Sequence, residues 1–259
     1  MTDPFADSIL FLDTVDSTNR YAADHFDELT DGTLVWAEEQ TAGRGRLGRS
    51  WLSPRGENLY VSWVVKQIRE PFFLAAAAAS LAVLETLRET AKSDLSFYLK
   101  WPNDIYCGPD KVSGILSEGV VRETLRGVIV GMGININSPE STLRRTGIRA
   151  ASLHSLDGRV FSLKKMIHQL AKHVCACYIM YLNDPDGLFA RWKAENLLIG
   201  QELDFVLPDG RVIRSPFLDI AEDGGAVILD DGRKRIFSCG DVRIAKESLN
   251  FKTSKNKEL

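Results

Sequence analysis

The alternation of hydrophobic and polar positions divides the chain into short strand-like runs separated by turn signals and helical segments. Apolar runs bounded by turn residues predict strands at residues 9–12, 33–37, 59–65, 97–100 and 125–130. Residues 111–116 continue into residues 118–121, and a polar turn then leads into the strand at 125–130. This arrangement predicts an antiparallel hairpin.

Four other segments have the composition and spacing of helices. Residues 16–19 offer capping side chains for a helix that reaches Leu29. We expect Pro71 at the first position of a long, alanine-rich helix that is buried on most sides. Ser162 is expected to cap a further helix, and residues 188–197 predict another.

The sequence pattern changes after Gly200, where short runs of alternating apolar and polar residues are separated by Asp-Gly and Gly-Gly turns. Stretches of this kind predict a small β-barrel that needs a larger domain to pack against. We therefore expect a large domain over residues 1–198, a barrel over 199–246, and a lysine-rich disordered tail over 247–259.

Composition narrows the class of protein. The 259 residues are 44% apolar and 26% charged, with a net charge of −3, which is typical of a globular protein and does not suggest a nucleic-acid partner. We expect no membrane segment and no secretory signal, hence a cytoplasmic protein. The four cysteines, Cys107, Cys175, Cys177 and Cys239, contain no Cys-x-x-Cys pair and are expected to be free thiols.

Residues 43–51, Gly-Arg-Gly-Arg-Leu-Gly-Arg-Ser-Trp, form the most distinctive segment. Its glycines let the backbone bend closely around a ligand, and Arg44, Arg46 and Arg49 supply fixed positive charge, so the segment predicts an anion site. The letters also fit a dinucleotide fingerprint and nearly fit a Walker A loop, but both require a helix directly afterwards. Pro54 and Gly56 exclude that helix. A kinase glycine loop is excluded because no His-Arg-Asp or Asp-Phe-Gly follows.

Several polar segments lie at strand ends and in loops: Asp16-Ser17-Thr18-Asn19, residues 40–49, Lys100-Trp101-Pro102-Asn103-Asp104, residues 111–116 and residues 131–135. Together they resemble the motifs of the biotin protein ligases, also called biotin-[acetyl-CoA-carboxylase] ligases. The resemblance spans about residues 8–245, and the order and spacing of the motifs make it far more specific than any one of them.

The resemblance implies an α+β fold, in which a mixed sheet with packed helices carries a small C-terminal SH3-like barrel. It also implies a two-step reaction. The carboxylate of biotin attacks the α-phosphate of Mg²⁺-bound ATP to give biotinyl-5′-adenylate, and a lysine of a biotin carboxyl carrier protein then displaces AMP. Only about seven residues precede the first strand, so the resemblance is to a form that lacks the N-terminal DNA-binding domain of some relatives, and we do not expect a repressor.

The same resemblance assigns roles to individual residues. Arg46, Lys111 and Asp104 are expected to be catalytic, with Asp104 positioning a metal-bound water or the incoming lysine. The residues expected to bind biotin are Ser17, Thr18, Asn19, Gln40, Gly43, Arg44, Arg46, Lys111 and Gly114. The residues expected to bind the nucleotide are Arg46, Arg49, Trp51, Asn103, Lys111 and Asn135. These roles make chemical sense because a carboxylate meets a triphosphate only where nearby cations offset two negative charges.

Two alternatives remain open from the sequence. A lipoate or octanoate transferase would share the fold, although the polar side chains of Ser17, Thr18 and Gln40 favour the ureido ring of biotin over a fatty acyl chain. A non-catalytic regulator would bind biotin without turnover, although Lys111 beside a complete arginine loop favours catalysis. The carrier protein and a homodimeric state are left undecided.

We also expect the arginine-rich loop at residues 43–51 to be mobile when empty and to close over the adenylate.

Overall fold

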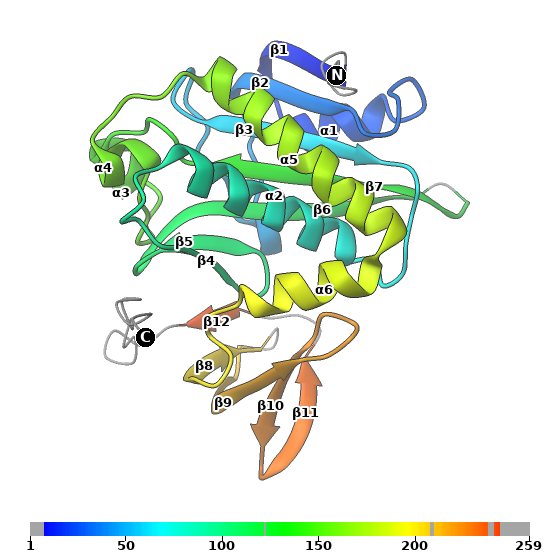
Figure 1. The fold of residues 1–259 in the computed structure, drawn as a ribbon, viewed down its shortest axis with the longest axis vertical. Coiled ribbons are helices and arrows are strands. Elements are labelled where there is room, and N and C mark those ends of the chain that lie inside the picture. The colour runs from blue at the N-terminus through cyan, green and yellow to red at the C-terminus, as the bar shows by residue number, and fades with distance from the viewer. Residues whose placement is uncertain (1–7, 122, 208–209, 238–240, 244–259) are drawn as a thin grey trace, which may run out of the picture. The chain divides into compact units, whose positions relative to one another are not determined.

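Figure 1 shows the computed structural model of the chain, which describes residues 8–121, 123–207, 210–237 and 241–243. The chain divides into two compact units, Met1–Asn196 and Leu197–Leu259. The division falls slightly before the boundary at residue 198 that the sequence suggested. The tail predicted over residues 247–259 lies outside the described residues.

One seven-stranded sheet forms the framework of the first unit, with the strand order β1-β2-β3-β7-β6-β5-β4 (Figure 1). Its strands are β1 (Ile9–Val15), β2 (Leu34–Gln40), β3 (Leu59–Val65), β4 (Phe97–Lys100), β5 (Asp104–Cys107), β6 (Asp110–Val121) and β7 (Leu125–Ile134). The pairing of β1 with β2 is parallel, and every other pairing in the sheet is antiparallel. The predicted mixed sheet and the β6–β7 hairpin are confirmed, while β5 was not predicted.

The register decides which side chains share a face, because alternate residues of a strand point to opposite sides. Ser62 of β3 pairs with Gly131 of β7, which pairs with Leu116 of β6, so these three residues lie on one face. Trp63 points to the opposite face, where its ring packs edge-on against Tyr178 at a centroid distance of 5.0 Å. The sheet therefore has a helix-covered face and a second face that carries glycine, serine and leucine side by side.

Helices cover the faces unequally. They are α1 (Thr18–Asp24), α2 (Leu74–Thr90), α3 (Glu140–Arg144), α4 (Leu153–Asp157), α5 (Leu163–Asn183) and α6 (Pro185–Ala194). In Figure 1, α2 and α5 cross the same face of the sheet. The short helix α1 packs on the opposite face, where Ala22 and Phe26 join a buried cluster with Val35, Val64 and Ile129.

Helix boundaries differ from the predictions in three places. Helix α2 begins at Leu74 with Phe73 as its N-cap, so the expectation that Pro71 occupies the first helical position is wrong. Helix α1 ends at Asp24, and the segment toward Leu29 continues as turns. Helix α6 begins at Pro185, earlier than predicted, because Asp184 caps it through the backbone N–H of Gly187. The predicted cap of α5 is confirmed, since Ser162 accepts from the backbone N–H of Lys165.

The second unit is a five-stranded antiparallel sheet with the order β11-β10-β9-β8-β12. Its strands are β8 (Glu202–Val206), β9 (Val212–Ile220), β10 (Ala226–Asp230), β11 (Arg233–Phe237) and β12 (Asp241–Arg243). Phe205 and Phe217 pack edge-to-face at 5.6 Å in its small core. This arrangement agrees with the SH3-like module that was expected.

Across the described residues, none of the helices combines the length and the apolar character needed to cross a membrane. Cys107, Cys175 and Cys177 belong to no disulfide, as expected, and Cys107 and Cys177 are buried, whereas Cys175 is partly exposed. Cys239 lies outside the described part. Burial raises the pKa of Cys177 to about 11, which keeps this thiol protonated and unreactive at neutral pH.

Candidate active site

The arginine-rich segment, residues 41–58, is a loop between β2 and β3, as predicted. Two backbone bonds shape it: the N–H of Gly45 donates to the carbonyl of Arg49 at 2.7 Å, and the N–H of Trp51 donates to the carbonyl of Gly43 at 2.9 Å. At its tip is a single 3-10 turn, η2 (Arg46–Gly48), and the chain is extended afterwards. The absence of a following helix in this described segment confirms that it is neither a dinucleotide fingerprint nor a Walker A loop.

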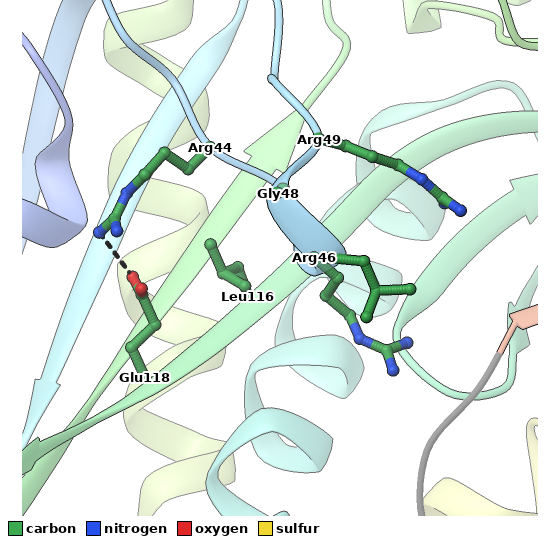
Figure 2. Close-up of a pocket in the computed structure, with 8 residues that line it drawn as sticks. Arg44, Arg46, Gly48, Arg49, Leu116 and Glu118 are labelled. Carbon is green, nitrogen blue, oxygen red and sulfur yellow. Dashed lines mark hydrogen bonds and ion pairs between the residues drawn. The ribbon is translucent and has the colours of Figure 1, made fainter. Parts of the chain in front are cut away.

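A pocket of about 380 Å³ lies beneath this loop, on the sheet face opposite α2 and α5. Its lining residues are Arg44, Gly45, Arg46, Leu47, Gly48, Arg49, Leu116 and Glu118. In Figure 2, Arg44 points toward Glu118 of β6, whereas Arg46 and Arg49 extend to the other side of the loop. Three cations and one carboxylate leave the pocket with excess positive charge, which suits an anionic ligand of small-molecule size.

Beside this pocket, hydroxyl and amide groups form a hydrogen-bonded cluster at the start of α1 and the end of β2. The backbone N–H and the hydroxyl of Thr18 lie 2.8 and 3.0 Å from Oε1 of Gln40. Nε2 of Gln40 donates to the hydroxyl of Ser53 at 2.9 Å. Ser53 in turn donates to the carbonyl of Trp51 at 3.1 Å. Because Gln40 is held at both ends of its amide, its orientation is fixed by its neighbours.

Asn19 connects this cluster to the pocket. Its Nδ2 donates to Glu118 at 2.7 Å, and its Oδ1 accepts from the hydroxyl of Ser62 at 2.5 Å. The side chain lies directly on the backbone of Gly131, where an added Cβ would come within 2.4 Å of Oδ1. Ser17, Thr18 and Asn19 are all nearly buried, at 3–5% exposure, although the side chain of Ser17 makes no cap hydrogen bond to α1. A glycine at position 131 is therefore required for Asn19 to occupy this site.

Lys111 and Asp104 form a largely buried ion pair at the other end of the site. Nζ of Lys111 lies 2.6 Å from Oδ1 of Asp104, and both side chains are about 15% exposed. The same ammonium group lies 5.4 Å from the ring centroid of Trp51. The indole of Trp51 rests on Gly133, where a Cβ would come within 2.5 Å of the ring, and it also approaches Gly114 of β6. In the described part of the chain, the buried indole N–H has no hydrogen-bond acceptor.

Asn103 and Asn135 occupy different surroundings. Asn103 accepts from Nη1 of Arg46 at 3.0 Å and donates to the carbonyl of Ile115 at 2.6 Å, so it joins the arginine loop to β6. Asn135 follows β7 and donates to the carbonyl of Ala151 at 3.2 Å. It is 7% exposed and is not among the residues that line the arginine pocket.

The structure adds residues that the sequence motifs did not single out. Glu118, Ser53 and Ser62 hold Arg44, Asn19, Gln40 and Trp51 in place, as described above. Ser62 is fully buried within an otherwise apolar strand, and a serine inside such a run was the available signal. Glu118 follows the lysine motif on the same strand, but only its pairing across the sheet shows that it faces the pocket.

No group of three or more His, Cys, Asp or Glu side chains within the described residues is arranged to hold a metal ion.

Near the site, a hydrogen bond from Arg20 lowers the pKa of Asp16, so this carboxylate remains ionised and accepts from the backbone N–H of Ser17 at 2.6 Å. That bond fixes the turn between β1 and α1, which delivers Thr18 and Asn19 to the site.

Comparison with known proteins places this geometry in context. Residues 11–135 match the model of the Biotin/lipoate A/B protein ligase family. The bifunctional ligase/repressor BirA of Escherichia coli is 38% identical over 254 residues, which cover 92% of this chain and 74% of BirA. The chain belongs to the biotin protein ligase family. The biotin--[acetyl-CoA-carboxylase] ligase of Mycobacterium tuberculosis is 33% identical over 218 residues, covering 82% of this chain and 79% of that one.

The fold of the family is shared as well. The structure of the biotin protein ligase from Aquifex aeolicus in complex with biotin and ATP superposes with a TM-score of 0.76 at 29% identity, and it covers 91% of this chain and 97% of that one. The α+β fold inferred from the family resemblance is therefore confirmed. The matched family model also spans all five of the motif stretches that carried the resemblance, up to Asn135.

Proposed function

We propose that this protein is an ATP-dependent biotin protein ligase. It activates biotin as biotinyl-5′-adenylate and transfers it to a lysine of a biotin carboxyl carrier protein. The observation that carries the proposal is the junction of two environments on one sheet face. A pocket with three arginines adjoins, through the Arg44–Glu118–Asn19 contacts, a neutral cluster of Thr18, Gln40 and Ser53. A ligand with a carboxylate and a neutral polar ring requires both.

The neutral cluster suits the ureido ring. A ureido group has two N–H donors and a carbonyl acceptor, and it needs paired partners when it is buried. The hydroxyls and amides of Ser17, Thr18, Asn19 and Gln40 supply such partners in a region that is largely shielded from water. The family resemblance also assigns Gly43 and Gly114 to the biotin site. A Cβ at Gly43 would meet the carbonyl of Trp51 at 2.4 Å, and one at Gly114 would lie 3.0 Å from the Trp51 ring, so both glycines are needed for the packing around this site.

In the first step, a carboxylate oxygen of biotin attacks the α-phosphorus of ATP, a P–O bond forms, and pyrophosphate leaves. Arg44 and Arg46 offset the charge of the two anions as they approach. Lys111 offers a movable ammonium group near the reacting oxygens, with Asp104 as its resting partner at 2.6 Å. Arg49, Trp51, Asn103 and Asn135 bind the nucleotide. The unpaired indole N–H of Trp51 is available to an acceptor atom of this ligand.

The nucleotide brings its own Mg²⁺. Magnesium at nucleotide sites is held mainly by phosphates and waters with one or two carboxylates. Asp104 is a suitable carboxylate for a metal-bound water, and the described residues need no enclosed metal cage for this role. In the second step, the amine of the carrier lysine attacks the acyl carbon of the adenylate, an amide bond forms, AMP leaves, and a proton is released.

ATP–pyrophosphate exchange tests the proposal because it isolates the adenylation step and requires no carrier protein. It is run with biotin, with octanoate and without an acid. Exchange that depends on biotin supports a biotin ligase, and exchange with octanoate identifies the lipoate branch of the family instead. No exchange with any acid, despite biotin binding in equilibrium dialysis, identifies a non-catalytic binding protein.

A further inference from the structure

Glu118 is a carboxylate in a pocket that is otherwise built for anions. It extends from β6 toward the arginine loop, and Figure 2 shows Arg44 pointing at it. Its Oε2 accepts from Nη2 of Arg44 at 2.9 Å and from Nδ2 of Asn19 at 2.7 Å. A negative charge here opposes the entry of an anionic substrate, so a favourable effect of this carboxylate must offset the repulsion.

Glu118 has a first favourable effect on the orientation of the Asn19 amide. An ionised carboxylate can only accept hydrogen bonds, so Glu118 requires Asn19 to turn its nitrogen toward β6. The carbonyl of Leu116, 3.3 Å from the same nitrogen, favours that orientation as well. The amide oxygen then lies over Gly131, where it accepts from the hydroxyl of Ser62 at 2.5 Å. An amide oxygen accepts two hydrogen bonds, so Asn19 retains one acceptor position for a ligand N–H.

Glu118 has a second favourable effect on the position of the Arg44 side chain. The side chain is 46% exposed, and a long exposed arginine has many rotamers to lose when it binds a ligand. The ion pair with Glu118 restricts those rotamers before the substrate arrives. A guanidinium group has five N–H donors, and the bond to Glu118 is made through Nη2. Arg44 can therefore bind Glu118 and a substrate carboxylate at the same time.

We propose that Glu118 is a positioning residue for the acid substrate, which sets the amide of Asn19 and the guanidinium of Arg44 in their binding arrangement. The inference rests on the proposed function, because it concerns the site of the same acid. The competing explanation is that Glu118 merely occupies Arg44 until the substrate carboxylate displaces it. The two explanations predict changes of opposite sign when the carboxylate is removed.

The test compares Glu118→Ala and Glu118→Gln with the wild-type protein by ATP–pyrophosphate exchange. For Glu118→Ala, we expect the KM for biotin to rise about tenfold or more, because two charge-assisted hydrogen bonds are lost. The KM for ATP and the melting temperature should remain near the wild-type values. Glu118→Gln should have a smaller effect, since its amide oxygen can take the place of Oε2 and accept from both Asn19 and Arg44, and only the negative charge is lost. Glu89→Gln, at the exposed ion pair with His173 between α2 and α5, is the control for loss of a surface carboxylate.

A second comparison separates positioning from general damage. If Glu118 acts in part through Asn19, Glu118→Ala should raise the KM for biotin less in an Asn19→Ala background than in the wild type. A lower KM for biotin in Glu118→Ala would overturn the proposal in favour of competition. Equal rises in both KM values would overturn it in favour of a structural role. Failure of the wild-type protein to exchange with biotin would instead refute the proposed function itself.

Discussion

Alanine at position 133 tests how the floor of the site supports Trp51. The added Cβ would lie 2.5 Å from Cε2, 2.7 Å from Cζ2 and 2.8 Å from Nε1 of the indole. Carbon atoms in favourable contact are about 3.5–4.0 Å apart, so the ring must move by roughly 1 Å or more. Its freedom to do so is limited, because Lys111 lies over the ring and the backbone N–H of Trp51 is bonded to the carbonyl of Gly43, which anchors this residue in the loop.

Overpacking of this kind costs about 1–3 kcal/mol. If all of that cost is expressed in nucleotide binding, the KM for ATP rises by a factor of roughly 5 to 150, since about 1.4 kcal/mol corresponds to tenfold. The KM for ATP in pyrophosphate exchange measures the effect, and thermal unfolding shows how much of it appears as global destabilisation.

Trp51→Ala provides the matched test, because it removes the whole indole ring that an alanine at position 133 would strike. The double variant Gly133→Ala/Trp51→Ala should therefore resemble Trp51→Ala alone. Two effects that simply add would refute the steric explanation, because independent contributions are the signature of sites that do not contact one another.

Three further changes have expected outcomes. Arg46→Gly should loosen retention of the adenylate and increase biotinylation of bystander lysines, measured by streptavidin blotting of an added unrelated protein; labelling at the wild-type level contradicts the role of Arg46. Lys111→Ala should abolish adenylate formation, and a variant that makes biotinyl-5′-adenylate at the wild-type rate in single-turnover assays removes Lys111 from the mechanism. A hydrogen bond from Arg159 lowers the pKa of the buried Asp157 carboxyl from 3.8 to about 2. A carboxyl whose pKa is lower in the folded protein than in the unfolded chain stabilises the fold at pH values above its unfolded pKa. Asp157→Asn should therefore lower the free energy of unfolding at pH 7 by about 1–2 kcal/mol, after allowance for the half-exposed arginine. That difference should shrink as the pH falls from about 4 toward 2; urea unfolding of both proteins at pH 7 and pH 3 measures it, and a constant difference contradicts the assignment.

Local sequence determined much of the framework. Apolar runs located β1, β2, β3, β4 and the β6–β7 hairpin, because residues close together in the sequence are sufficient to indicate a strand or a hairpin. Proline and glycine after the arginine loop were sufficient by themselves to exclude a phosphate-binding helix there. The helix start at Leu74 was missed because proline is tolerated both at the first position of a helix and in the turn before it.

The partners within the site were decided by the tertiary structure. Asn19 and Glu118 are 99 residues apart in the sequence, and no local pattern connects them. They meet because the register of β3, β7 and β6 places Ser62, Gly131 and Leu116 side by side, and α1 packs over that row. A shift of one residue in any of these strands would turn Glu118 or Ser62 to the other face. The sequence therefore specified the charged loop and the kind of chemistry, whereas strand register specified which side chains hold that loop and orient its neighbours.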